Sequence, residues 1–297
     1  MALLKRTPGE KVFNVINYLV MIVLCIVCLY PLWYVLVASL SDPVQMYANR
    51  GILLWPLQPM TTKGYTLVFE DPNIPRSFLN TLIYLGVGTL LNMFVTCMGA
   101  YGLSRKGLFW NGKVMKLIAF TMYFSGGLIP FYLMVQQMNL LDTYSGIILP
   151  VLVNTWNLIV MRTSFAGLPD SLEESARLDG ANDWTILWRI FLPLAQATVA
   201  VIALFYAVYW WNNWFNPSLF LQDKTKYPLQ LRLREILLKN DTNSMTQVGA
   251  VGQSQQEQYR LLVKYCTIIV ATVPILVVYP FLQRYFVKGV MIGAIKG

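Results

Sequence analysis

The chain has 297 residues, of which 56% are hydrophobic and only 12% are charged. Soluble domains carry about a quarter charged residues, so this composition excludes an ordinary soluble domain and favours several membrane-spanning helices. The net charge of +9 does not indicate a nucleic-acid-binding protein, because membrane proteins concentrate Lys and Arg on their cytoplasmic loops.

The residue types present exclude several kinds of chemistry. The sequence has no histidine, which removes Ser-His and Cys-His nucleophilic catalysis and histidine-ligated metal sites. It has no GxxxxGK[ST] pattern, so we expect no ATP hydrolysis by a P-loop on this chain. All four cysteines lie in apolar runs, and the C-x-x-C pair Cys25 and Cys28 falls in the middle of a predicted helix. We therefore expect no catalytic residue and no metal site.

Six apolar runs predict six transmembrane helices and hence an all-α membrane protein. The runs cover residues 14–40, 77–103, 114–135, 144–162, 191–215 and 260–283. The preceding segment, 1–13, lacks the features of a signal peptide, so the first helix is expected to act as an uncleaved signal anchor. The predicted organisation is a short segment at 1–13, a six-helix domain at 14–283 and a tail at 284–297.

The distribution of Lys and Arg predicts which side of the membrane each loop faces. Basic residues are enriched in the N-terminal segment, in the short loops after the second and fourth helices, and in the tail. The opposite side carries its basic residues mostly in long loops, which have less influence on topology. Both termini and the loop 166–193 are therefore predicted to be cytoplasmic, and the loop 216–258 to lie outside.

The cores of the predicted helices contain essentially no Asp, Glu, Lys or Arg. Ion-coupled transporters and voltage sensors keep ionisable groups at membrane depth. An ion-coupled secondary transporter or channel is thus the less favoured alternative, and the energy for any transport is expected to come from another subunit.

The loop 166–193 is a dense polar stretch between two apolar helices. Ser171 and Glu174 match a capping box, which predicts that a short helix begins there. Gly180 suits the position just after that helix, and Asp183 is expected to cap a second short helix. Pro193 is then expected in the first turn of the fifth span. The loop is either a surface helix at the headgroup layer or an amphipathic helix that docks into a partner.

Polar and aromatic residues in and near the fourth and fifth spans have two interpretations. Asn154 and Asn157 are predicted to share one helical face, where they either join helices or line a path. The stretch "YWWNNWFNPSLF" contains a cluster that is either an aromatic belt at the membrane surface or part of a translocation path. Its members are Trp211, Asn212, Asn213 and Trp214. The loop 216–258 is either a disordered connector or a functional loop.

The loop 166–193 also carries a resemblance to a known family. "E-S-A-R-L-D-G-A" followed by "I-F-L-P" resembles the EAA motif of ABC importer permeases, E-A-A-x-x-x-G-x₉-I-x-L-P, with Ser175 in place of the middle alanine. "GAYGLSR", "GLIPFYLMVQQMNLLDTYSGIILP" and the tail look like the carbohydrate branch, of the maltose-permease type. "TMYFSGGLIP" and "KYPLQLRLREILL" resemble a subgroup from importers of oligosaccharides derived from complex polysaccharides.

The resemblance implies a type I ABC importer permease in the cytoplasmic membrane of a bacterium, which is a transport subunit and not an enzyme. Residues 166–193, here named the coupling loop, would contact a cytoplasmic ATPase. The residues carried over are Glu174, Ala176, Asp179, Gly180, Ala181, Ile190, Leu192 and Pro193. The tail would also contact the ATPase, through Lys288, Gly289, Lys296 and Gly297, unless it is only a basic end near anionic lipid.

The same resemblance implies the partners and the path of the cargo. It implies a second related permease subunit, two ATP-binding subunits that hold ATP and Mg²⁺, an extracytoplasmic sugar-binding protein and surrounding lipid. No cofactor is expected on this chain and no nucleic acid among its partners. The aromatic and Asn side chains named above would then contact sugar in the path, and the loop 216–258 would probe the docked binding protein.

Overall fold

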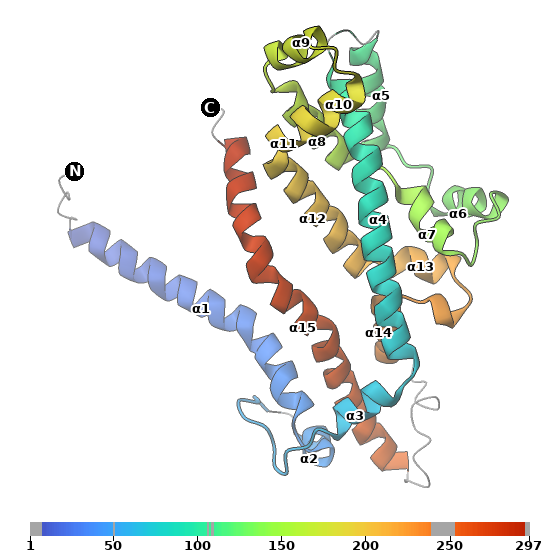
Figure 1. Cartoon of the computed structure of the whole chain (residues 1–297). Coiled ribbons are helices and arrows are strands. Elements are labelled where there is room, and N and C mark those ends of the chain that lie inside the picture. The colour runs from blue at the N-terminus through green and yellow to red at the C-terminus, as the bar shows by residue number, and fades with distance from the viewer. Residues whose placement is uncertain (1–7, 50, 106, 108–109, 239–252, 295–297) are drawn as a thin grey trace. The chain divides into compact units, whose positions relative to one another are not determined.

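In the computed structural model, the chain is a series of helices joined by short connectors (Figure 1). The structure describes residues 8–49, 51–105, 107, 110–238 and 253–294, and every regular element in these ranges is helical. The elements are α1 (Pro8–Ser39), α2 (Pro43–Ala48), α3 (Lys63–Glu70), α4 (Asn73–Ser104), α5 (Asn111–Tyr123), α6 (Leu128–Gln137), α7 (Tyr144–Ile148), η1 (Leu149–Val151), α8 (Thr155–Ala166), α9 (Asp170–Leu178), α10 (Asp183–Ile186), the π-helix η2 (Leu187–Phe191), α11 (Leu192–Leu194), α12 (Gln196–Asn212), α13 (Phe215–Phe220), η3 (Lys224–Lys226), α14 (Leu229–Leu238) and α15 (Gln253–Ala294).

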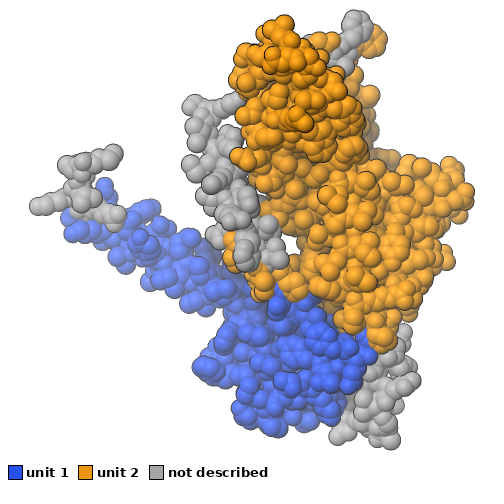
Figure 2. Space-filling model, in the orientation of Figure 1, with its two compact units in different colours: residues 1–71, 239–273 blue, residues 72–238, 274–297 orange. Residues whose placement is uncertain are grey.

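The chain divides into two compact units, coloured separately in Figure 2. Unit 1 comprises residues 1–71 and 239–273. Its small core joins the end of α1 to the segment that follows, through Val37, Ala38, Met46 and Leu53. Along the rest of α1 the apolar side chains are exposed, as expected for a helix whose neighbours are lipid or other subunits.

Unit 2 comprises residues 72–238 and 274–297, and α4 is its central helix. α8 and α12 pack against α4, and the Trp210 indole on α12 donates to Asn92 Oδ1 on α4 at 2.8 Å. The two helices approach closely at Gly88, where an added Cβ would lie 2.3 Å from Trp210. A small residue on one helix and a large one on the other therefore fix how α4 and α12 pack.

Three of the six predicted spans are single helices. α1, α4 and residues 258–277 of α15 are each long and apolar enough to cross a bilayer. The other three apolar runs do not form single helices. Each is a bent pair: α5 with α6 at 111°, α7 and η1 with α8 at 51°, and the segment Asp183–Leu194 with α12 at 89°.

Local backbone chemistry explains two of these breaks. Gly127, between α5 and α6, has φ +85°, a value that side-chain-bearing residues rarely adopt. Asn154 caps the start of α8, accepting a hydrogen bond from the Asn157 N–H at 3.0 Å. Apolar periodicity does not distinguish a single helix from two helices broken by such residues, so the breaks could not be read from the apolar runs.

The segment 216–238, inside the loop predicted at 216–258, is folded and not a disordered connector. It forms α13, η3 and α14, and it is anchored to the N-terminal part of α4. Asn80 donates to the backbone carbonyls of Thr225 and Tyr227, at 2.8 and 3.1 Å, and the Leu229 N–H donates to Thr81 Oγ1. Residues 239–252 of the predicted loop lie outside the described residues.

Candidate functional site: the coupling loop and the substrate path

The coupling loop lies at the C-terminal end of α4, where Figure 1 shows α9 and α10. α9 has acidic residues in its first turn and Arg177 in its last, an arrangement that complements the helix dipole. Gly180 then adopts φ +80°, as predicted. The N–H groups of Gly180 and Ala181 donate to the carbonyls of Arg177 and Ala176, which closes the helix in a Schellman motif.

Three local predictions for this loop are wrong. α9 begins at Asp170 after Pro169 and has no side-chain cap, so Ser171 does not form a capping box. Asn182 caps α10 by accepting from the Thr185 N–H, and Asp183 is the first residue of that helix. Pro193 lies in α11, before the 89° bend, and not in the first turn of α12.

The predicted coupling residues fall into two groups. Glu174 is exposed and makes no ion pair in the described part of the chain, and Asp179, Gly180 and Pro193 are exposed as well. The others belong to the core that α4, α8 and α12 share: Ala176 is buried there, with Ala181, Ile190 and Leu192 packed against it. The packed members of the motif therefore attach the loop to its own bundle, and the exposed members are accessible to a partner.

The most exposed apolar side chain of the loop is Leu178, at the end of α9. It is 89% exposed, whereas Ala176, two positions earlier, is 8% exposed. A large apolar residue beside an exposed carboxylate is typical of a surface that a partner protein covers. α9 thus presents Glu174 and Leu178 away from the bundle.

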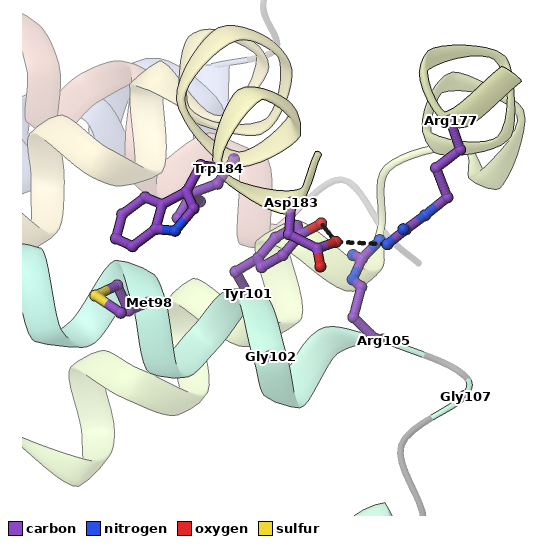
Figure 3. Close-up of a pocket in the computed structure, with 9 residues that line it drawn as sticks. Met98, Tyr101, Gly102, Arg105, Gly107, Arg177, Asp183 and Trp184 are labelled. Atoms are coloured by element: carbon purple, nitrogen blue, oxygen red, sulfur yellow. Dashed lines mark hydrogen bonds and ion pairs between the residues drawn. The ribbon is translucent and has the colours of Figure 1, made fainter. Parts of the chain in front are cut away.

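Five side chains form a network, not predicted from the sequence, that connects the coupling loop to α4; Figure 3 shows four of them. Glu173 pairs with Arg105 at the end of α4, and it also accepts from Arg177 at 2.9 and 3.0 Å. Arg177 reaches Asp183 at 2.6 Å, and the Tyr101 hydroxyl donates to the same carboxylate at 3.0 Å. Together these residues link α4, α9 and α10.

The network borders a cavity of about 520 Å³, which Met98, Gly102, Gly107, Trp184 and Leu187 also line. The Arg105 guanidinium carbon lies 5.0 Å from the centre of the Tyr101 ring and 4.4 Å from that of Phe191. The hydrogen bonds that Arg177 donates to Glu173, and then those to Asp183, stabilise the charged guanidinium and raise the pKa of Arg177 above its usual value. Every charged member of the network thus has an oppositely charged partner.

The predicted path residues in the fourth span are not equivalent. Asn154 precedes α8 as its cap, and its own N–H donates to the Tyr206 hydroxyl at 3.2 Å. Asn157 lies inside α8 and is buried, and its side chain makes no hydrogen bond among the described residues. The prediction that both lie on one helical face is wrong, because α8 begins only after Asn154.

The residues of the aromatic cluster at the end of α12 also differ in burial and in hydrogen bonding. Trp211 and Asn213 are buried. Neither the Trp211 indole N–H nor the Asn213 amide nitrogen has a hydrogen-bond partner among the described residues. Asn212 is exposed and donates to the Val208 carbonyl. Trp214 is half-buried, and the Arg234 guanidinium of α14 stacks on its ring at 3.4 Å. Arg234 was not predicted as a site residue, because it lies 20 positions further along the sequence.

The predicted tail contacts lie at the edge of what the structure describes. The backbone of Lys288 and Gly289 is helical, because α15 continues to Ala294. Lys296 and Gly297 lie outside the described residues. Among the described residues, no three His, Cys, Asp or Glu side chains lie close enough to hold a metal ion.

Comparison with known proteins gives one consistent family. Residues 1–292 match the model of the binding-protein-dependent transport system inner membrane component. The chain is 38% identical to the polygalacturonan/rhamnogalacturonan transport system permease protein YtcP of Bacillus subtilis, over 97% of this chain and 99% of that protein. It is also 38% identical to the protein LplC of Bacillus subtilis, over 98% of this chain and 97% of that one.

A solved structure agrees with this result. A chain of a bacterial ABC transporter involved in the import of the acidic polysaccharide alginate matches with a TM-score of 0.85 at 29% identity. The match covers 95% of this chain and 99% of that one. Permeases of this kind are multi-pass proteins of the bacterial inner membrane, are not enzymes, and work with a partner ATPase and a binding protein. The chain therefore belongs to the family of binding-protein-dependent transport system inner membrane components and is a permease subunit of an ABC importer.

Proposed function

We propose that this chain is one of two related permease subunits in an ATP-driven importer of acidic oligosaccharides. In this proposal the coupling loop faces the cytoplasm and contacts one of two ATP-binding subunits, which hold ATP and Mg²⁺. The segment 216–238 faces outside, where an extracytoplasmic sugar-binding protein delivers the substrate. Lipid and the second permease cover the exposed apolar helices.

The arrangement of two sites along α4 is the observation that carries this proposal. Arg105, at the C-terminal end of α4, binds the coupling loop, and Asn80, near the other end, binds the segment 216–238. The two residues are 25 positions apart, which corresponds to about 38 Å along an α-helix. The hydrocarbon core of a bilayer is about 30 Å thick, so one rigid helix connects a site on each side of the membrane.

The acidic nature of the substrate is supported by one side chain and by the relatives. YtcP is named for the transport of polygalacturonan and rhamnogalacturonan. The importer of known structure is involved in the import of the acidic polysaccharide alginate. In this chain Arg234 is exposed, stacks on Trp214 and has no ion pair with any described residue. A guanidinium that stacks on an indole keeps the N–H groups at its edge free. These groups can bind one carboxylate through two parallel hydrogen bonds.

Reconstitution with the ATPase subunits and the binding protein tests the transport function. Proteoliposomes should accumulate a galacturonide oligosaccharide only with internal ATP and external binding protein. Uptake driven by an ion gradient without nucleotide would contradict the proposal and favour the secondary transporter.

Two variants test the substrate class in the same proteoliposomes. Arg234→Gln should lower galacturonide uptake about tenfold, the effect of one charge-assisted hydrogen bond, and leave uptake of a neutral oligosaccharide unchanged. Lys224→Gln is the matched control, because Lys224 is exposed in the same segment and stacks on no aromatic ring among the described residues. Equal losses in the two variants would indicate a general effect of charge and would contradict a carboxylate site at Arg234.

A further inference from the structure

α9 has little apolar packing of its own to hold it in place. Ala176 is its only buried residue, and the helix is nine residues long. One small side chain can fix the position of a helix, but it leaves the helix free to rotate about that contact. The orientation of α9 must therefore depend on its polar contacts.

The polar contacts of α9 converge on α4. Glu173 lies one helical turn before Arg177 and binds both Arg177 and Arg105. The side chains of Arg105 and Glu173 are only 19% and 17% exposed, whereas Arg177 and Asp183 are 49% and 63% exposed. The Arg105–Glu173 pair is thus the most protected part of the network, and the least screened by water.

Arg105 is held in place by α4 and by the π-helix. Ser104 Oγ accepts from its Nε and Nη2 at 3.1 and 2.8 Å, and the rings of Tyr101 and Phe191 lie on its guanidinium. The remaining guanidinium edge faces Glu173. A movement of α9 is therefore passed to a side chain that cannot adapt by changing its own conformation.

We propose that Arg105 and Glu173 are positioning residues that transmit the movement of α9 to α4, and that neither contacts the ATPase. Glu173 thus differs in role from its neighbour Glu174, which is exposed and faces a partner. Arg105 also lines the cavity described above. On that side, therefore, no close packing of other side chains holds α9 to α4. This inference rests on the proposed function, because it assigns a part to residues within the same importer.

The complete reconstituted importer tests this role. Glu173→Gln should leave subunit stoichiometry unchanged and ATP hydrolysis within about twofold of the unaltered complex, as for a substitution that preserves folding and docking. Transport should fall at least about fivefold, so that more ATP is used per sugar moved, since coupling between sites is typically 5–150-fold. Glu70→Gln, an exposed glutamate on α3, is the matched control and should change neither quantity.

Exchanging the two charges tests whether the loss of transport in Glu173→Gln is only a structural effect. In an Arg177→Gln background, which removes the second arginine beside Glu173, Arg105→Glu combined with Glu173→Arg should recover at least about half of the transport that Glu173→Gln loses there, because the charge pair between α4 and α9 is restored. Parallel losses of ATP hydrolysis and transport in Glu173→Gln would overturn the proposal, since they indicate a failure of docking or folding. Unchanged transport would overturn it as well.

A cross-link gives an independent measurement. In a background with Cys25→Ser and Cys28→Ser, Arg105→Cys and Glu173→Cys are joined by a short bifunctional maleimide. If α9 and α4 move as one body, the joined importer keeps its ATP use per sugar and transports better than the unjoined double-cysteine variant. Arrest of transport by the cross-link would overturn the proposal. Failure of the proposed function itself would appear earlier, as a lack of ATP-dependent uptake by the unaltered complex.

Discussion

Two adjacent glutamates in the coupling loop differ in their surroundings. Glu173 points to the bundle and is enclosed by two arginines, whereas Glu174 is exposed and unpaired within the described residues. Successive residues of an α-helix point about 100° apart, so neighbours in sequence face different partners. This difference separates a residue that holds the loop from one that is available to bind the ATPase.

Glu174→Lys is expected to weaken binding of the ATPase subunit while leaving the permease folded. The substitution reverses a charge on an exposed surface and removes no contact inside the chain. The fraction of ATPase that co-purifies with the permease should fall about tenfold or more, as for other interface charges. Glu70→Lys, the same reversal on α3, is the control. Recovery of both variants at normal stoichiometry would show that Glu174 has no part in docking.

Asn157→Ala is expected to change sugar transport without loss of assembly. The Asn157 side chain is buried but makes no hydrogen bond among the described residues, so its removal breaks no internal hydrogen bond. A sugar hydroxyl in the path can pair with this amide without displacing an internal partner. The KM for uptake should rise about threefold to tenfold, which corresponds to one neutral hydrogen bond. Unchanged kinetics would make Asn157 a helix-packing residue.

At the scale of the elements, α4 and α12 are joined by a close approach at one glycine. Gly88 faces Trp210, which is 1% exposed and hydrogen-bonded to Asn92. A large rigid side chain that is held in this way cannot move to make room for an added methyl group.

Gly88→Ala should therefore destabilise unit 2 by about 1–3 kcal/mol, the usual effect of overpacking a core. Gly86→Ala is the matched control, because Gly86 lies on the same helix and an added Cβ there meets nothing within 4 Å. The control should be neutral or stabilise the helix by about 0.5–1 kcal/mol. Thermal unfolding in detergent measures both, and equal midpoints would contradict the packing at Gly88.

The segment 216–238 is also held by charges that depend on pH. Asp142 accepts from the N–H groups of Asp223 and Gln222, and Lys226 pairs with it at 3.2 Å. The backbone hydrogen bond from Asp223, opposed by partial burial and aided by Lys226, lowers the pKa of Asp142 below 3.8. A hydrogen bond from Thr225 lowers the pKa of Asp223 as well.

Because both pKa values are lower in the folded state, these contacts stabilise the segment above about pH 4 and are lost as the pH falls further. Amide exchange of residues 222–227 should thus be constant from pH 8 to about pH 4, after correction for intrinsic rates, and then accelerate. The double variant Asp142→Asn with Asp223→Asn should lose this acceleration. An acceleration already near pH 6 would indicate a different titrating group.

At the scale of the whole molecule, the chain provides membrane spans and contact sites but no nucleotide-binding loop. Its sequence lacks a P-loop pattern, and its exposed helices require neighbours. We expect the purified permease alone to hydrolyse no ATP and to bind no nucleotide. Hydrolysis should appear when the ATPase subunits are added and increase with binding protein and sugar. Hydrolysis by the permease alone, measured after removal of contaminating ATPase, would contradict this division of labour.

The sequence by itself determined the membrane environment, the number of apolar runs and the place of the coupling loop. These are local properties: transfer free energy depends on composition within a window, and Gly180 ends α9 through its own backbone freedom. The bends inside three spans were not predictable, because broken and straight helices share the same apolar pattern.

Only the tertiary structure decided which charges meet. Arg105 and Glu173 are 68 positions apart, and nothing in the sequence around either indicates that they form an ion pair. The same holds for Trp214 and Arg234, which meet because α14 packs against α13, the helix that Trp214 precedes. Pairs of this kind depend on how helices pack, and packing is set by the shapes of side chains distant in sequence, such as Gly88 and Trp210.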